Sequence, residues 1–93
     1  MSTPHEVLAE ARPRVAPMFR LQWEEVQSAW VLLYPEGMVK LNGSAGEIMR
    51  RCEGTRSTRE IAAELESQFG AADLLPDVVA FLEMARAQRW IEI

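Results

Sequence analysis

Cysteine and histidine are almost absent from this sequence, which contains one of each. A single cysteine, Cys52, can neither close an intramolecular disulfide nor supply a four-thiolate zinc site, so packing alone must stabilise the fold. His5 lies in a stretch that we expect to be mobile, whereas a general base or a metal ligand must be held beside its partner. We therefore predict that the protein is not an enzyme and has neither a metal ion nor another cofactor, and that Cys52 packs as a small apolar side chain.

Positive charge is also in short supply, because 14 acidic residues outnumber 10 basic ones and leave a net charge of -4. Nucleic-acid binders gain most of their affinity by neutralising phosphates with Lys and Arg, so this balance opposes nucleic-acid binding. No apolar run approaches the ~20 residues of a membrane helix, and the N-terminal residues lack the basic flank and apolar stretch of a secretory signal. We expect a cytoplasmic protein with no nucleic-acid or membrane partner.

The composition is that of one folded domain, since 48% of the 93 residues are apolar and 26% are charged, unlike a disordered chain. Pro4, Pro13 and Pro17 interrupt the first 17 residues. We predict that residues 1–17 form a flexible N-terminal arm with one helical turn around residues 6–11, and that residues 18–93 form the domain.

Three strands are expected at the start of this domain. Apolar and polar residues alternate over residues 19–23, and residues 28–34 are aromatic and β-branched with apolar groups on both faces. Tyr34-Pro35-Glu36-Gly37 then has proline where a turn needs its preset φ, and we expect Gly37 in a left-handed conformation that closes a bulged hairpin. The third strand follows at residues 38–41.

Three helices should follow, because the apolar period changes after residue 41. The first, capped by Asn42 or by a Ser44/Glu47 capping box, should carry a buried stripe from Ala45 to Cys52 and end at Gly54. The second should begin at a capping box and end at a glycine, and the third should begin at a proline. The residues concerned are Ser57, Glu60, Ile61, Ala62, Leu65, Phe69 and Gly70 for the second helix, and Pro76, Val78, Phe81, Leu82 and Ala85 for the third. The fold class is therefore α+β, with a three-stranded antiparallel sheet followed by three helices.

Three features suggest a binding surface. The outer edge of the third strand has no obvious partner, and an unpaired edge is a template for a visiting strand. A loop or the N-terminal arm could equally shield this edge. Apolar residues 30–34 exceed what one sheet face needs, so they either line a contact surface or lie under the arm. Val79 and Met84 fall outside the stripe of the third helix, so they are either exposed or widen the core.

The sequence resembles the PqqD family over residues 13–92. The resemblance rests on the LLYPEG…LN…A..I pattern of residues 32–48 and the C.GTRS..EI pattern of residues 52–61, with further matches at Leu65, Asp77-Val78, Phe81-Leu82 and Trp90-Ile91. It departs from the family at Glu53, where Asp is usual, and at Arg89, where a glycine is usual, which puts a left-handed helix stop there in doubt.

This resemblance implies a winged-helix-like domain that acts as a peptide chaperone in pyrroloquinoline quinone (PQQ) biosynthesis. Family members bind the ribosomally made precursor peptide PqqA and deliver it to the radical S-adenosylmethionine (SAM) enzyme PqqE. The peptide adds a strand beside the third strand, in the groove next to the third helix. The peptide-binding residues that the resemblance implies are Met38, Val39, Lys40, Leu41, Asp77, Val78, Phe81 and Met84.

Two other functions remain open at this point. The order of strands and helices is also compatible with a winged-helix nucleic-acid-binding protein, with Arg59 near the start of its second helix. The second alternative is an enzyme subunit whose chemistry depends on carboxylates. The apolar surface and the arm also allow a homodimer formed by arm or strand exchange.

Overall fold

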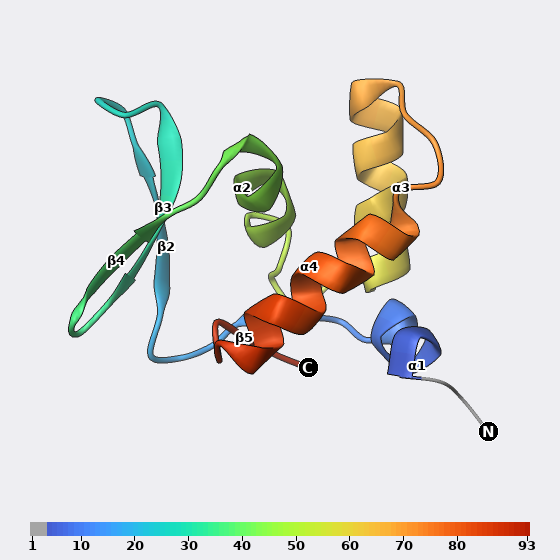
Figure 1. The fold of residues 1–93 in the computed structure, drawn as a ribbon, viewed down its shortest axis with the longest axis horizontal. Coiled ribbons are helices and arrows are strands. Elements are labelled where there is room, and N and C mark those ends of the chain that lie inside the picture. The colour runs from blue at the N-terminus through green and yellow to red at the C-terminus, as the bar shows by residue number, and fades with distance from the viewer. Residues whose placement is uncertain (1–3) are drawn as a thin grey trace.

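The structure, a computed structural model, describes residues 4–93 and has an antiparallel sheet with helices packed on one side (Figure 1). The predicted order of three strands and then three helices is confirmed. A short helix precedes them where a helical turn was expected around residues 6–11, and there is also a small second sheet. In chain order the elements are α1 (Pro4–Glu10), β1 (Arg14–Val15), β2 (Arg20–Glu24), β3 (Ala29–Tyr34), β4 (Gly37–Lys40), α2 (Gly43–Met49), α3 (Thr58–Phe69), α4 (Leu75–Ala87) and β5 (Ile91–Glu92). No helix within residues 4–93 is long and apolar enough to cross a membrane.

The main sheet has the order β2-β3-β4, with β3 in the centre and antiparallel to both neighbours. Leu32 on β3 belongs to the core that the helices share, whereas Val31 points to the opposite face beside Gln22 and Lys40. The helix side also carries two aromatic pairs, Phe19–Tyr34 and Trp23–Trp30, with ring centroids 5.6 and 5.5 Å apart. The sheet therefore has an inner face toward the helices and an outer face, on which apolar Ala29, Val31, Leu33 and Met38 lie beside polar Arg20, Gln22, Glu24 and Lys40.

The β3–β4 hairpin closes differently from the prediction. Tyr34 pairs directly with Gly37, so the loop contains only Pro35 and Glu36. Gly37 is not among the residues with positive φ, so the expected left-handed glycine and its bulge are absent from this hairpin. The regular pairing keeps β4 in register along its whole length, which matters for its free edge.

Helix α2 begins at the predicted cap and lies very close to the sheet. The backbone N–H of Ala45 donates to Oδ1 of Asn42 at 2.8 Å, so Asn42 is the cap and the proposed Ser44/Glu47 capping box is wrong. A Cβ atom at Gly46 would lie 2.8 Å from Cδ1 of Trp30, so only glycine permits this approach to β3. The helix ends at Met49, earlier than the predicted end at Gly54, and Cys52 reaches the core from the turn beyond the helix.

The other two helices follow the predicted signals at their starts. Ser57 and Glu60 form a reciprocal capping box at α3, and proline occupies the first turn of α4. Val79 is 1% exposed, so it widens the core of α4, whereas Met84 is 40% exposed. The prediction that Phe69 belongs to the buried stripe of α3 is wrong, since 57% of this residue is exposed at the end of the helix.

The N-terminal segment packs against the domain, so a separate arm that ends at residue 17 does not describe residues 4–17. Leu8 and Ala9 of α1 are buried in the core, and α1 contacts α3 and α4. Strand β1 pairs with β5 at the other end of the chain. The sequence did not predict this packing, because only two apolar residues of a short helix, Leu8 and Ala9, enter the core and three prolines interrupt the same stretch. The rest of the predicted arm, residues 1–3, and the side chain of His5 lie outside the described residues.

A buried arginine joins α2 to α3. Arg51 is 5% exposed and donates from Nη1 to Oε1 of Glu47 at 2.8 Å, from Nε to Oε1 of Glu64 at 3.1 Å, and from Nη2 to Gln68. The Arg51 hydrogen bond holds the pKa of Glu47 below its ordinary value. Partial burial raises the pKa of Glu64, but hydrogen bonds from Arg51 and Arg56 outweigh it and leave that pKa lowered as well.

Replacing Arg51 with methionine should lower the free energy of unfolding at pH 7 by about 2 kcal/mol, because the hydrogen bonds to charged groups are lost. A carboxylate whose pKa is lowered by folding contributes stability above its ordinary pKa of 4.5, and this contribution disappears as the pH falls through the lowered pKa. The wild type should therefore lose stability more steeply than Arg51→Met below pH 4.5. Urea titrations between pH 7 and pH 3 measure both effects. Arg59→Met, which removes an exposed pair with Glu10, is the control and should change little.

Helix α4 keeps a left-handed stop although arginine replaces the usual glycine. Arg89 has φ 66°, the N–H of Trp90 donates to the carbonyl of Ala85, and the N–H of Arg89 donates to that of Arg86. These two bonds are those of a Schellman motif. The doubt that Arg89 raised about this stop is therefore resolved, and the turn directs Trp90 back toward the helix.

The left-handed conformation of Arg89 should carry a measurable cost. We expect Arg89→Gly to raise the free energy of unfolding by about 1 kcal/mol, because glycine adopts positive φ without a Cβ clash. For a domain of this size the melting temperature should rise by about 4–8 °C in calorimetry. Gln88→Gly is the matched control, since Gln88 has φ -81° and glycine there should destabilise. Equal changes in the free energy of unfolding for the two substitutions would contradict backbone strain at Arg89.

Candidate functional site: the free edge of β4 and its groove

The outer edge of β4 carries unpaired main-chain groups. The N–H of Leu41 donates to the carbonyl of Trp30 at 3.0 Å, and hydrogen-bonded pairs alternate along an antiparallel ladder. Val39, opposite Leu32, therefore also bonds inward. The N–H and carbonyl groups of Met38 and Lys40 point the other way, and within residues 4–93 β4 pairs only with β3. The vacant row thus consists of the main-chain groups of two residues.

The N-terminal arm, one of the two shields that the sequence left open, does not cover this edge. Helix α1 contacts α3 and α4, and β1 pairs with β5, so these two elements lie away from β4 (Figure 1). Helix α1 is also remote from the outer face of the main sheet. The alternative that the N-terminal segment occupies the edge is therefore wrong for residues 4–17.

A pocket of about 290 Å³ lies between this edge and α4. We call it the edge pocket. The β4 side supplies Val39 and Lys40, α4 supplies Phe81 and Met84, and Trp90 closes it from beyond the left-handed turn. Leu41, Asn42, Ser44 and Ala45 complete the lining. An extended chain that paired with β4 would therefore have apolar side chains of the protein within reach.

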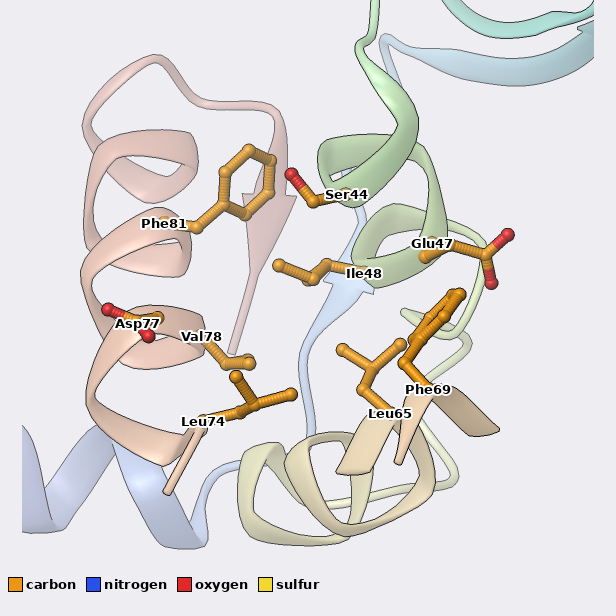
Figure 2. Close-up of a pocket in the computed structure, with 9 residues that line it drawn as sticks. All are labelled: Ser44, Glu47, Ile48, Leu65, Phe69, Leu74, Asp77, Val78 and Phe81. Atoms are coloured by element: carbon orange, nitrogen blue, oxygen red, sulfur yellow. The ribbon is translucent and has the colours of Figure 1, made fainter. Parts of the chain in front are cut away.

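A second pocket of about 200 Å³ adjoins the first and is lined by α2, the end of α3 and the start of α4. We call it the Phe69 pocket. Figure 2 shows Ile48, Leu65 and Val78 directed into it, with the rings of Phe81 and Phe69 at two of its sides. Because Ser44 and Phe81 line both pockets, the two pockets are parts of one groove along α4. The remaining lining residues are Glu47, Leu74 and Asp77.

Comparison with known proteins shows which family has this architecture. The family profile described as "Coenzyme PQQ synthesis protein D (PqqD)" matches residues 29–91. The chain belongs to the PqqD family. The matched segment contains β4, α2 and α4, so both pockets lie within the part that the family shares, and the resemblance found in the sequence is confirmed.

Individual relatives agree with this assignment. A protein from Pseudomonas fluorescens is 51% identical over 82 residues, covering 87% of this chain and 90% of its own, and one from Azotobacter vinelandii is 49% identical with coverages of 87% and 89%. Both are named PqqA binding protein. The solution structure of the PqqD truncation of Methylobacterium extorquens PqqCD has a TM-score of 0.72, 28% identity and coverages of 87% and 88%. It is described as a functional, stand-alone recognition element for ribosomally synthesized and post-translationally modified peptides (RiPPs). The predicted α+β fold class is thus confirmed.

The structure brings together seven of the eight predicted site residues of this PqqD family member. Val39, Lys40, Leu41, Phe81 and Met84 line the edge pocket, while Asp77, Val78 and again Phe81 line the Phe69 pocket. Met38 is the exception, because its side chain lies on the outer face of the sheet opposite Leu33 and lines neither pocket. Only its main chain faces the vacant edge.

Sequence reasoning missed several residues of this groove. Trp90 reaches it through the left-handed turn at Arg89, which no local pattern predicts for an arginine. Phe69 was predicted to be buried because it continues the apolar stripe of α3. It is the last residue of that helix, however, and it is exposed. Its place next to the helix-ending Gly70 was a signal of exposure, because a terminal turn packs on fewer neighbours.

The residues singled out for chemistry have structural partners or are buried. Burial raises the pKa of the Cys52 thiol to about 12, and its Sγ donates to the carbonyl of Ile48 at 3.4 Å. Arg59, on which the nucleic-acid alternative depended, pairs with Glu10 at 2.8 Å. Within the described residues, no group of three or more His, Cys, Asp or Glu side chains is arranged to hold a metal ion.

The high pKa and burial of Cys52 predict an inert thiol. At pH 8 we expect iodoacetamide to alkylate the folded protein at least about a hundredfold more slowly than the urea-unfolded chain, whose thiol has an ordinary pKa. Mass spectrometry of timed samples gives both rates. Similar rates in the two states would show that Cys52 is accessible and would contradict its place in the core.

Proposed function

We propose that this chain binds the precursor peptide PqqA by strand addition at β4 and presents it to the radical SAM enzyme PqqE. The observation that carries the proposal is the vacant row at Met38 and Lys40, which borders a groove with apolar walls. The names of the PqqA binding proteins and the description of the PqqCD domain support the choice of guest.

Strand addition separates the strength of binding from its selectivity. Main-chain hydrogen bonds to Met38 and Lys40 form with any extended chain, so they provide affinity regardless of sequence. Side chains of the guest that point toward α4 meet Val39, Phe81 and Met84 in the edge pocket. Selectivity for PqqA therefore depends on these apolar contacts.

Presentation to PqqE follows from how such a complex forms. A flexible peptide loses conformational entropy when it docks, which offsets part of the interaction free energy and favours moderate affinity. The guest also becomes an edge strand with one side exposed. A bound peptide that is extended, accessible and releasable is a suitable substrate for a second protein.

The vacant edge can be tested with a proline. Lys40→Pro removes an outward N–H donor, so we expect PqqA to bind at least about tenfold more weakly in calorimetric titration, with the fold retained. Val39→Pro removes an inward ladder bond instead, and should mainly lower the melting temperature. The distinction arises because consecutive residues of β4 point their N–H groups to opposite sides.

Lys40→Ala is the matched control, because it removes the charged side chain and keeps the backbone N–H. Its affinity for PqqA should stay close to that of the wild type. An amide spectrum establishes that each variant is folded. Unchanged PqqA affinity in a folded Lys40→Pro variant would overturn binding at β4.

A further inference from the structure

The Phe69 pocket continues the groove beyond the place where β4 ends. Ser44 and Phe81 line both pockets, so the second pocket is within reach of a chain that leaves the edge pocket past Lys40. In Figure 2 the ring of Phe81 is directed toward Ser44. A guest longer than the four residues of β4 therefore has a defined path.

The direction of the guest determines which of its flanks takes this path. All strands of the sheet are antiparallel, and antiparallel pairing is slightly more stable per residue than parallel pairing. A guest antiparallel to β4 begins opposite Lys40 and ends opposite Gly37. Its N-terminal flank is consequently the part that extends toward α2 and the Phe69 pocket.

The chemistry of the pocket suits a large apolar side chain. Its interior is formed by Ile48, Leu65 and Val78, and Phe69 at its rim leaves 57% of its surface exposed. The carboxylates of Glu47 and Asp77 lie at the rim and point away from the interior (Figure 2). Burying an apolar group here would remove surface of Phe69 from water as well, whereas a charged group would lose its hydration among apolar side chains.

The walls of this pocket are held in place before any guest arrives. Oε2 of Glu66 accepts a hydrogen bond from the N–H of Leu74 at 2.9 Å, which fixes the connection between α3 and α4. Glu47 is held by Arg50 and Arg51 at 3.0 and 2.8 Å. A pocket that is already ordered loses little entropy on binding.

We propose that the Phe69 pocket is a second peptide subsite, which takes one large apolar side chain from the N-terminal flank of the strand-adding guest. This subsite rests on the proposed function, because its occupant reaches it from β4. It adds a specificity determinant at α2, α3 and α4, outside the edge pocket between β4 and α4.

The test measures PqqA binding to Phe69→Ala by isothermal titration. The variant should fold, since Phe69 is largely exposed. Its affinity for PqqA should fall by about tenfold, because the substitution removes the aromatic ring at the rim of the pocket. Val26→Ala is the matched control, because it also truncates an exposed apolar side chain, 96% exposed in the β2–β3 turn, far along the chain from the groove. Its affinity should equal that of the wild type.

A second series uses PqqA peptides shortened one residue at a time from the N-terminus. Once the anchoring side chain is removed, wild type and Phe69→Ala should bind the shortened peptide equally, because the two truncations remove the same contact. A tenfold difference that persists for every shortened peptide that still binds would overturn the assignment to the N-terminal flank.

The outcomes separate this subsite from the proposed function. If Lys40→Pro weakens binding and Phe69→Ala does not, strand addition at β4 stands and the subsite is overturned. If neither substitution weakens binding, the proposed function fails together with the subsite. Loss of affinity in both variants, with the difference at Phe69 abolished by N-terminal shortening, is the expected result.

Discussion

The alternation of hydrogen bonds along an antiparallel ladder is the constraint on which the site depends. Val39 and Leu41 direct their main-chain groups to β3, so those of Met38 and Lys40 must point outward. Because the hairpin closes with a regular two-residue turn, no bulge disturbs this alternation. The same geometry places the side chain of Val39 on the inner face, where it contributes to the groove. In the proposed function, main-chain recognition and side-chain selection both follow from this one register.

The other wall of the groove is held by the core of the helices. Val79, Leu82 and Ala85 anchor α4 on its buried side, which leaves Phe81 and Met84 toward the groove. Gly46 lets α2, which contributes to the lining of both pockets, pack closely on Trp30 of β3. Because α4 is held by its buried side and β4 by its pairing with β3, the groove keeps both walls without a ligand.

Among the described residues, three ion pairs join elements that are distant along the chain. Arg51 joins α2 to α3, and the Glu10–Arg59 and Arg14–Glu92 pairs connect the N-terminal segment to α3 and to β5. The groove, in contrast, is lined mainly by apolar side chains and main-chain groups. In the proposed function, this division separates the contacts that maintain the fold from those offered to the peptide.

The sequence by itself determined the local structure, including the three central strands, the capping box of α3, the proline start of α4 and the family. These features depend on neighbours within a few residues, so alternation, caps and motifs carry them. Tertiary structure alone decided that Leu8 and Ala9 enter the core, that Met38 points away from the groove, and that Trp90 and Phe69 border it. The physical reason is that burial and facing depend on which elements meet in space, and such contacts between residues distant along the chain leave no period in the sequence.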